Sequence, residues 1–222
     1  MYREWGPAPA LAGRVTHVWT NIAISSSTQL VVPDGCVDLI WGPEGPHVAG
    51  PDTGPMPVRM SSGDRYFGIR FRPGAVGGVF GVPVEALRDS RVPLAELGVL
   101  PGLTPSTMQE MLAVRLREAP GPDPAAPAIA RALREGRSVG QVAWDLGLGE
   151  RQLHRRSLRA FGYGPKTLQR VVRFQRALRL ARSGVAPAEV AVVSGYADQS
   201  HMANEVRRLA GVPLGRLVGR PS

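Results

Sequence analysis

The feature that most constrains this chain is a short motif that occurs twice, 48 residues apart. Val142-Ala143 is followed after three residues by Gly147, and Val190-Ala191 is followed in the same way by Gly195. A small Ala lets two helices cross closely, and Gly accepts the turn between them. Each copy precedes a polar, arginine-bearing segment long enough for one helix. The repeat therefore predicts two helix-turn-helix units, each with its own DNA-recognition helix.

The charge of the chain is unequal between its halves. Residues 1–120 carry ten basic and 11 acidic side chains, whereas residues 121–222 carry 17 basic and seven acidic ones. A coding bias toward arginine would raise the basic content of both halves, so it does not explain the difference. We therefore expect the second half alone to bind double-stranded DNA.

Length and composition exclude several other classes of protein. A chain of 222 residues can form two domains, each with a core of its own. The sequence has no run of 18 apolar residues, and its N-terminus lacks the apolar centre of a signal peptide. Its single cysteine, Cys36, can form neither an internal disulfide nor a multi-cysteine zinc site. We expect a cytoplasmic protein that has no membrane partner and needs no metal or cofactor.

The expected fold class is α+β, with a β-rich, barrel-like domain at residues 1–118. Short runs of strand character, separated by Gly, Pro, Asp and Ser turns, lie at 14–20, 28–32, 36–41 and 66–71. Trailing helices are expected at 74–81, 84–89 and 104–118. The last carries an apolar stripe that packs on the barrel or, less favoured, forms a dimer face: Met108, Met111, Leu112 and Leu116. The proline-rich residues 119–127 are the expected linker, and 128–222 the DNA-binding domain.

The N-terminal half offers few candidates for catalysis. They are His17, Asp34, Cys36, Asp38 and His47, and none has metal-ligand spacing. Asp34 belongs to a hairpin-type turn, and Cys36 is more typical of a small buried residue than of a nucleophile. We expect no enzyme here. A pocket for a small-molecule effector inside the barrel is the more plausible use.

The C-terminal half shows clear helix boundaries. Ser138 and Gln141 form a capping box that begins a helix at 139–146, and the first recognition helix follows at 150–160. Pro165 opens a long helix to residue 182. The second unit begins at 187–194, and Asp198 caps its recognition helix, 199–210.

Side-chain geometry indicates what each recognition helix would contact. Arg151 and Arg155 suit guanine, whereas Gln199 and Asn204 suit adenine. Six further cations are expected to bind phosphates, which position a protein without specifying sequence: Arg156, Arg159, Lys166, Arg173, Arg207 and Arg208.

Residues 138–218 resemble the DNA-binding domain of the AraC/XylS family of bacterial transcription regulators. The segments 195–202 (GYADQSHM) and 207–213 (RRLAGVP) are similar to that family's second-unit signature. Segments that resemble one subgroup, including its uncharacterised N-terminal domain, lie at 31–43, 68–75, 162–168 and 173–177. The resemblance implies seven helices in the C-terminal domain and two units entering successive major grooves. It also places base contacts at Arg151, His154, Arg155, Gln199, Ser200 and Asn204.

The chain departs from the family at five positions. Ser157 and Val206 stand where an aromatic residue is usual, which predicts looser packing of both recognition helices. Gly149 stands where a Ser N-cap is usual, which lowers the stability of the helix by only about 0.3 kcal/mol. Asn204 stands where Arg is common, and Leu214 where Pro is common. We therefore expect the first unit to supply most of the affinity.

The leading hypothesis is a one-component transcription regulator, with an effector-sensing or dimerising N-terminal domain. The first alternative is a regulator that acts through Cys36, either by accepting an alkyl group on its thiol or by sensing redox state through an intermolecular disulfide. The second is a protein-interaction module that has lost DNA recognition, as suggested by Ser157, Asn204 and Val206.

Overall fold

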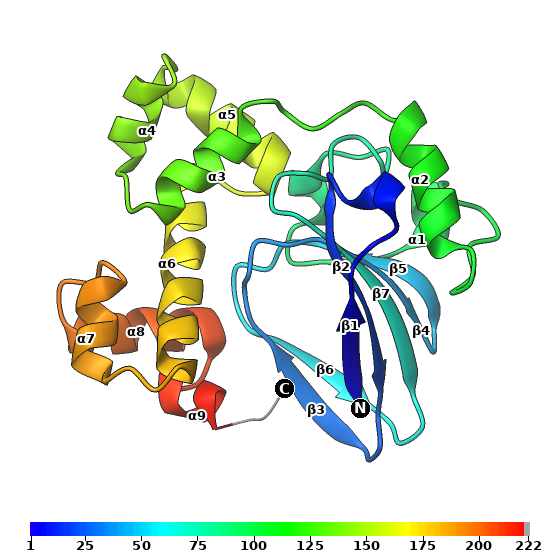
Figure 1. Cartoon of the computed structure of the whole chain (residues 1–222), viewed down its shortest axis with the longest axis horizontal. Helices are drawn as coiled ribbons and strands as arrows, with labels where there is room; N and C mark the ends of the chain where they lie inside the picture. Colours follow the sequence, from blue (N-terminus) through cyan, green and yellow to red (C-terminus); the bar gives the residue numbers. More distant parts are fainter. Residues whose placement is uncertain (220–222) are drawn as a thin grey trace.

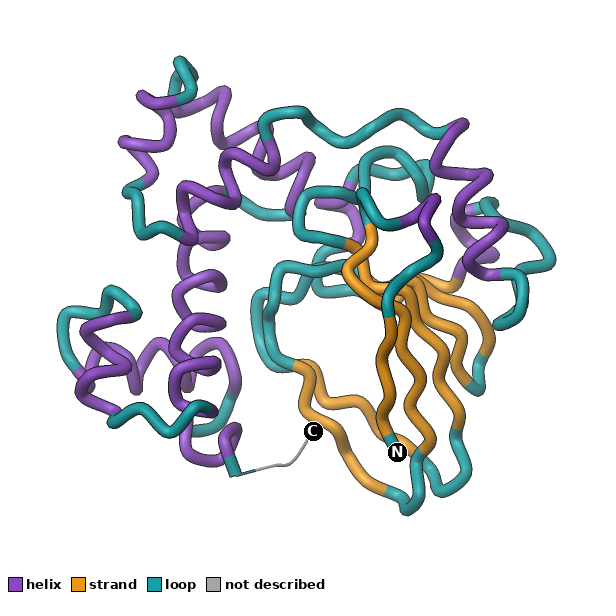
Figure 2. The backbone as a smooth tube through the Cα atoms, viewed as in Figure 1, coloured by secondary structure: helices purple, strands orange, loops and turns teal. Residues whose placement is uncertain are grey.

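The computed structural model describes residues 1–219, which form a β-rich N-terminal part and a helical C-terminal part (Figure 1). Figure 2 shows the strands gathered in one part of the molecule and the helices of the C-terminal half in the other. Among the described residues, no helix is long and apolar enough to cross a membrane. This arrangement agrees with the expected α+β class.

The N-terminal part is built on two antiparallel sheets. The larger has six strands in the order β1-β2-β7-β4-β5-β8, and the smaller pairs β3 with β6. The strands are β1 (Tyr2–Trp5), β2 (Val15–Ile22), β3 (Ser27–Val31), β4 (Asp38–Gly42), β5 (Gly45–Ala49), β6 (Met56–Met60), β7 (Arg65–Phe71) and β8 (Arg91–Pro93). The pairing of β2 with β7 is the longest, with seven registered pairs from Val15↔Phe71 to Ile22↔Arg65.

The two faces of the larger sheet differ in chemistry, because successive side chains in a strand point to opposite faces. Val18, Leu39 and Ile69 are fully buried on one face. The helix α2 (Met108–Glu118) contributes Met108 and Leu112 to the same core. The apolar stripe of this helix therefore packs on the sheet, as favoured from the sequence.

Several boundaries in the N-terminal half differ from the expectation. Residues 74–81 form turns instead of a helix, because Gly74, Gly77 and Gly81 all adopt positive φ angles, which a right-handed helix excludes. The helix expected at 84–89 is a 3-10 helix, η2 (Val84–Leu87). The strands β1, β5, β6 and β8, the 3-10 helix η1 (Pro9–Leu11) and the short helix α1 (Leu94–Leu97) were not expected.

The C-terminal part contains the seven helices expected from the resemblance, counted over the described residues. They are α3 (Ala126–Arg134), α4 (Val139–Asp145), α5 (Glu150–Phe161), α6 (Pro165–Arg182), α7 (Pro187–Val193), α8 (Gln199–Ala210) and α9 (Leu214–Val218). α6 runs between the helices α3–α5 and the helices α7–α9 (Figure 1). Its Leu168 and Val171 belong to the core of the first group, and its Phe174 and Leu178 to that of the second. One helix therefore carries both helix-turn-helix units.

Candidate DNA-binding surface

The first helix-turn-helix unit is α4 and α5. Its capping box is present: Gln141 N donates to Ser138 Oγ at 3.2 Å, and Ser138 N donates to Gln141 Oε1 at 2.8 Å. At the start of α5, Gly149 N donates to Gln152 Oε1 at 2.9 Å. Of the two hydrogen bonds of a capping box, Gly149 thus keeps the one that its backbone N–H donates.

The base-contact candidates of α5 lie on its exposed face. Arg151, His154 and Arg155 are exposed, whereas Leu153 and Ser157 are fully buried. This division follows the helical repeat, because positions three and four residues apart share a face. The ring of His154 lies close to the start of α6, where a Cβ on Gly164 would be 2.7 Å from its Cε1.

The Ser157 position is better packed than the sequence predicted. Its hydroxyl donates to the carbonyl oxygen of Tyr163 at 2.8 Å, inside the turn between α5 and α6. This hydrogen bond joins α5 to the segment that leads into α6. In α8, Val206 is likewise fully buried.

The second unit is α7 and α8, and its recognition helix begins as expected. The Asp198 carboxylate accepts a hydrogen bond from His201 N at 2.7 Å, which satisfies a free N–H of the first turn. Gln199, Ser200 and Asn204 are exposed, while Met202 faces the core. The candidate contacts of α8 therefore face solvent.

A wide cleft of about 1150 Å³ lies along the two units. Its lining comes from both halves of the chain and includes five Arg or Lys side chains and two carboxylates: Thr53, Arg88, Asp89, Val139, Gly140, Glu150, Arg151, His154, Leu158, Tyr163, Gly164, Pro165, Lys166, Thr167, Arg170 and Arg208. Arg170 was not predicted from the sequence, although it lies four residues after Lys166 on the same helical face. The cleft brings Arg151 and His154 of α5 together with Arg208 of α8.

The six cations expected to bind phosphates fall into two groups. Arg159, Lys166, Arg207 and Arg208 are exposed. Arg156 instead donates to the Asp123 carboxylate at 2.8 Å, at the segment that connects the two parts of the chain.

Arg173 also has partners within the chain. Its guanidinium lies 4.6 Å from the centre of the Tyr196 ring and donates to Gly195 O at 3.3 Å. Glu205 accepts from Arg170 at 2.8 Å. Arg156 and Arg173 would therefore have to exchange existing contacts in order to bind phosphates.

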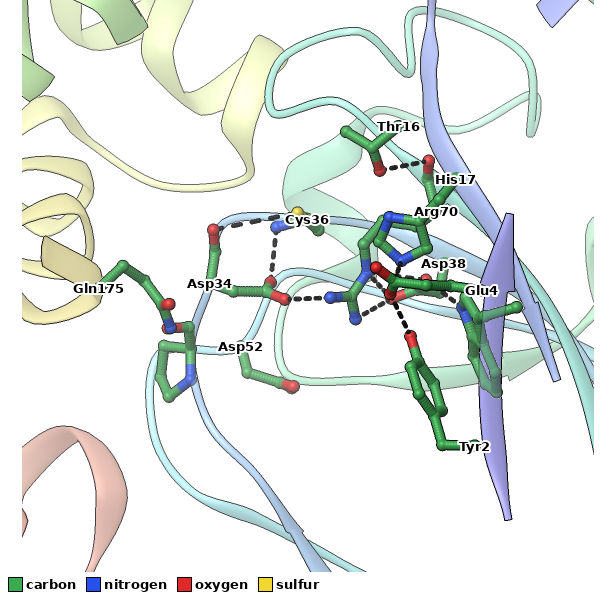
Figure 3. Close-up of polar contacts among 12 residues, drawn as sticks. Tyr2, Glu4, Thr16, His17, Asp34, Cys36, Asp38, Asp52, Arg70 and Gln175 are labelled. Atoms are coloured by element: carbon green, nitrogen blue, oxygen red, sulfur yellow. Dashed lines mark hydrogen bonds and ion pairs between the residues drawn. The ribbon is translucent and has the colours of Figure 1, made fainter. Parts of the chain in front are cut away.

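The N-terminal half presents a polar cluster centred on Arg70 (Figure 3). Its guanidinium lies 2.9 Å from Asp34 Oδ2 and 2.9 Å from Asp38 Oδ2, and the Trp19 indole N–H donates to Asp38 at 3.1 Å. Burial alone would lower the pKa of Arg70, but the two carboxylates raise it well above its ordinary value. Burial raises the pKa of Asp34 in spite of the Arg70 charge.

Cys36 lies in the same turn, where its N–H donates to Asp34 Oδ1 at 2.8 Å. Burial and the neighbouring Asp34 carboxylate raise the pKa of this thiol well above its ordinary value. A thiol that stays protonated is a poor nucleophile, so the site does not favour alkyl transfer or redox chemistry. Within residues 1–219 there is no cluster of three or more His, Cys, Asp or Glu side chains that could hold a metal ion.

The turn that contains Asp34 reaches the DNA-binding half. Gln175 of α6 donates to Pro33 O at 2.6 Å, and a Cβ on Gly35 would lie 3.2 Å from the Tyr163 hydroxyl oxygen. The sequence did not predict these contacts, although all of these residues lie in the subgroup-specific segments. The segments that mark the two domains therefore touch each other.

Comparisons with known proteins agree with this geometry. Residues 142–220 match the family model described as a helix-turn-helix domain, and residues 3–93 match a domain of unknown function (DUF6597). No curated protein is similar enough to match the sequence.

Among solved structures, ToxT from Vibrio cholerae has a TM-score of 0.51 at 10% identity, covering 90% of this chain and 97% of that one. ToxT with an unsaturated fatty acid bound has a TM-score of 0.46 at 8% identity, with 92% and 89% covered. A probable AraC family transcriptional regulator from Rhodopseudomonas palustris has a TM-score of 0.38 at 20% identity, covering 45% of this chain and 100% of that one.

The two matched domains follow each other along the chain, and the first ToxT structure has a similar fold over most of its length. The chain therefore consists of a DUF6597 domain followed by a helix-turn-helix domain, and it has the fold of ToxT.

Proposed function

We propose that the chain binds a specific duplex DNA site through α5 and α8, and that the N-terminal domain adjusts this binding in response to a small molecule. The observation that carries the proposal is the cleft, in which Arg151 and His154 of α5 lie with Lys166 and Arg170 of α6 and Arg208 of α8. Arg151 and Arg155 are the proposed guanine contacts, with His154 beside them. Gln199, Ser200 and Asn204 are the proposed contacts of the second unit.

The test of base contact is Arg155→Ala. Losing a two-bond contact to guanine should cost about 1–3 kcal/mol at one base pair and relax specificity there. Arg131→Ala is the matched control. Arg131 is exposed on α3 and does not line the cleft, and its replacement removes the same charge as Arg155→Ala. Gel-shift titrations over a panel of single-base variants of the site separate the two effects. Equal losses in both variants at every base pair would refute the contact.

The phosphate contacts have a different signature. Arg207→Ala should weaken binding to all sequences alike and lower the slope of log affinity against log salt by about one. Arg156→Ala should leave that slope unchanged, because its guanidinium is bound to Asp123. A chain that bound DNA weakly with no salt slope would instead favour the protein-interaction alternative.

The effector part of the proposal rests on the polar face of the larger sheet. Trp19 lies over Gly68 there, beside the Arg70 cluster, and Asp34 connects this cluster to the turn that touches α6. A ligand that binds beside Trp19 could thus change the position of the DNA-binding half.

A metabolite panel, followed by Trp fluorescence and thermal shift, tests for such an effector. Trp19→Leu should abolish the response to any ligand found. A response that persists in this variant would place the effector elsewhere.

A further inference from the structure

The two recognition helices end in the same way. α5 ends at Phe161 and α8 at Ala210, and each is followed by a glycine in the left-handed conformation. Gly162 has φ 80° and donates to Leu158 O at 2.9 Å, while Gly211 has φ 69° and donates to Arg207 O at 2.8 Å. A C-terminal cap of this kind suits glycine because other residues are strained there.

Both caps lie against one short loop of the N-terminal domain, residues 51–55. A Cβ on Gly162 would lie 2.6 Å from Pro51 Cγ, and a Cβ on Gly211 would lie 3.2 Å from Pro55 Cγ. The backbone of each helix end thus lies close to one proline ring, and at Gly162 the distance leaves no room for a Cβ. The same five residues therefore contact the ends of both recognition helices.

This loop is held firmly by its own domain. Asp52 is buried and accepts two hydrogen bonds from the Arg91 guanidinium, at 3.0 and 2.8 Å. Thr53 N donates to the Asp89 carboxylate at 2.6 Å, and Asp89 N donates to Pro51 O at 3.2 Å. The proline at each end limits the backbone further. The loop therefore has the fixed shape that a spacer needs.

We propose that residues 51–55 act as a strut that sets the distance and orientation between the two recognition helices, so that the N-terminal domain determines which spacing of DNA half-sites the chain prefers. This inference rests on the proposed function, because it assigns a geometry to the same DNA site. Two linked binding units gain affinity only when their separation matches that of their sites. A strut at both helix ends would fix that separation before DNA is bound.

The first test measures the helices without DNA. Spin labels at Arg159→Cys and Arg207→Cys, in a Cys36→Ser background of the full chain, report the distance between α5 and α8. The strut variant is Pro51→Ala with Pro55→Ala, which removes both contacting Cγ atoms. Its control is Pro57→Ala, an exposed proline of β6. We expect a broader distance distribution in the strut variant alone. An unchanged width would overturn the proposal.

The second test measures DNA binding by the unlabelled chains. Duplexes carrying the selected site are made with the two half-sites at the natural spacing or moved by one base pair. The wild type should favour the natural spacing by about tenfold or more, as expected for a rigid bivalent binder, and the strut variant should lose most of this preference. An equal preference in both chains, or tighter binding of the strut variant at every spacing, would overturn the strut.

The two proposals fail in different ways. If the wild type selects no DNA sequence, the proposed function fails, and the distance measurement still decides whether the loop fixes the helices. If the wild type selects a site and the distances are insensitive to the loop, the strut alone fails.

Discussion

At the scale of single residues, Arg70 has the largest structural role in the N-terminal half. Its one guanidinium pairs with Asp34 and Asp38, and its side chain is only 29% exposed. The pairing fixes the turn that contacts α6 through Pro33. A single cation thus links the polar face of the sheet to the DNA-binding half.

Removing this cation should be costly. Arg70→Leu leaves two carboxylates without their partner, and the loss of one member of a buried pair costs about 3–5 kcal/mol. Urea unfolding of the full chain measures the change in the free energy of unfolding. Arg72→Leu is the control, because Arg72 is exposed and should change that energy by about 0.5 kcal/mol or less. Equal small effects of the two substitutions would show that the Arg70 cluster contributes little.

His47 predicts a pH dependence. Burial lowers its pKa below the ordinary value of 6.5. As the pH falls below 6.5, His47 becomes protonated in the unfolded chain before it does so in the folded chain. Its contribution to stability is therefore present at higher pH and is lost as the pH falls. Between about pH 7.5 and about pH 5, the free energy of unfolding of the wild type should therefore fall more than that of His47→Gln. A difference that is constant over this range would contradict the shift.

At the scale of elements, how much the sequence reveals depends on local signals. The capping residues Ser138 and Asp198 and the opening Pro165 correctly located α4, α8 and α6. The strands β1 and β8 were missed because they have only four and three residues. The contacts of Gln175 and Tyr163 were also missed, since a contact between domains leaves no periodic pattern in either segment.

The turn between α5 and α6 gives a prediction at this scale. Ser157→Ala removes the hydrogen bond to Tyr163 O and should cost about 1 kcal/mol. Ser157→Phe, which restores the usual aromatic residue, should cost about 1–3 kcal/mol, because the site is fully buried and has no room for a ring. Thermal unfolding of the three chains measures both effects. A more stable Phe variant would show that the turn is loosely packed, as the sequence alone suggested.

At the scale of the whole molecule, residues of both halves line the cleft proposed to bind DNA. The basic half supplies α5, α6 and α8, and the N-terminal half supplies Arg88, Asp89 and Thr53 to the same cleft. The charge asymmetry and the repeated motif were sufficient to predict which half binds DNA. The contribution of the N-terminal half to the cleft became visible only in the structure, because Thr53, Arg88 and Asp89 lie far from α5 in sequence.

The most direct measurement is selection of bound duplexes from a random-sequence pool by the full chain, repeated with Arg155→Ala and Gln199→Ala. Two conserved boxes should emerge, their centres about one helical turn (about 10 base pairs) apart. Arg155→Ala should erase a guanine preference in one box, and Gln199→Ala an adenine preference in the other. A pool without enrichment, or boxes that both variants leave intact, would contradict specific binding through α5 and α8.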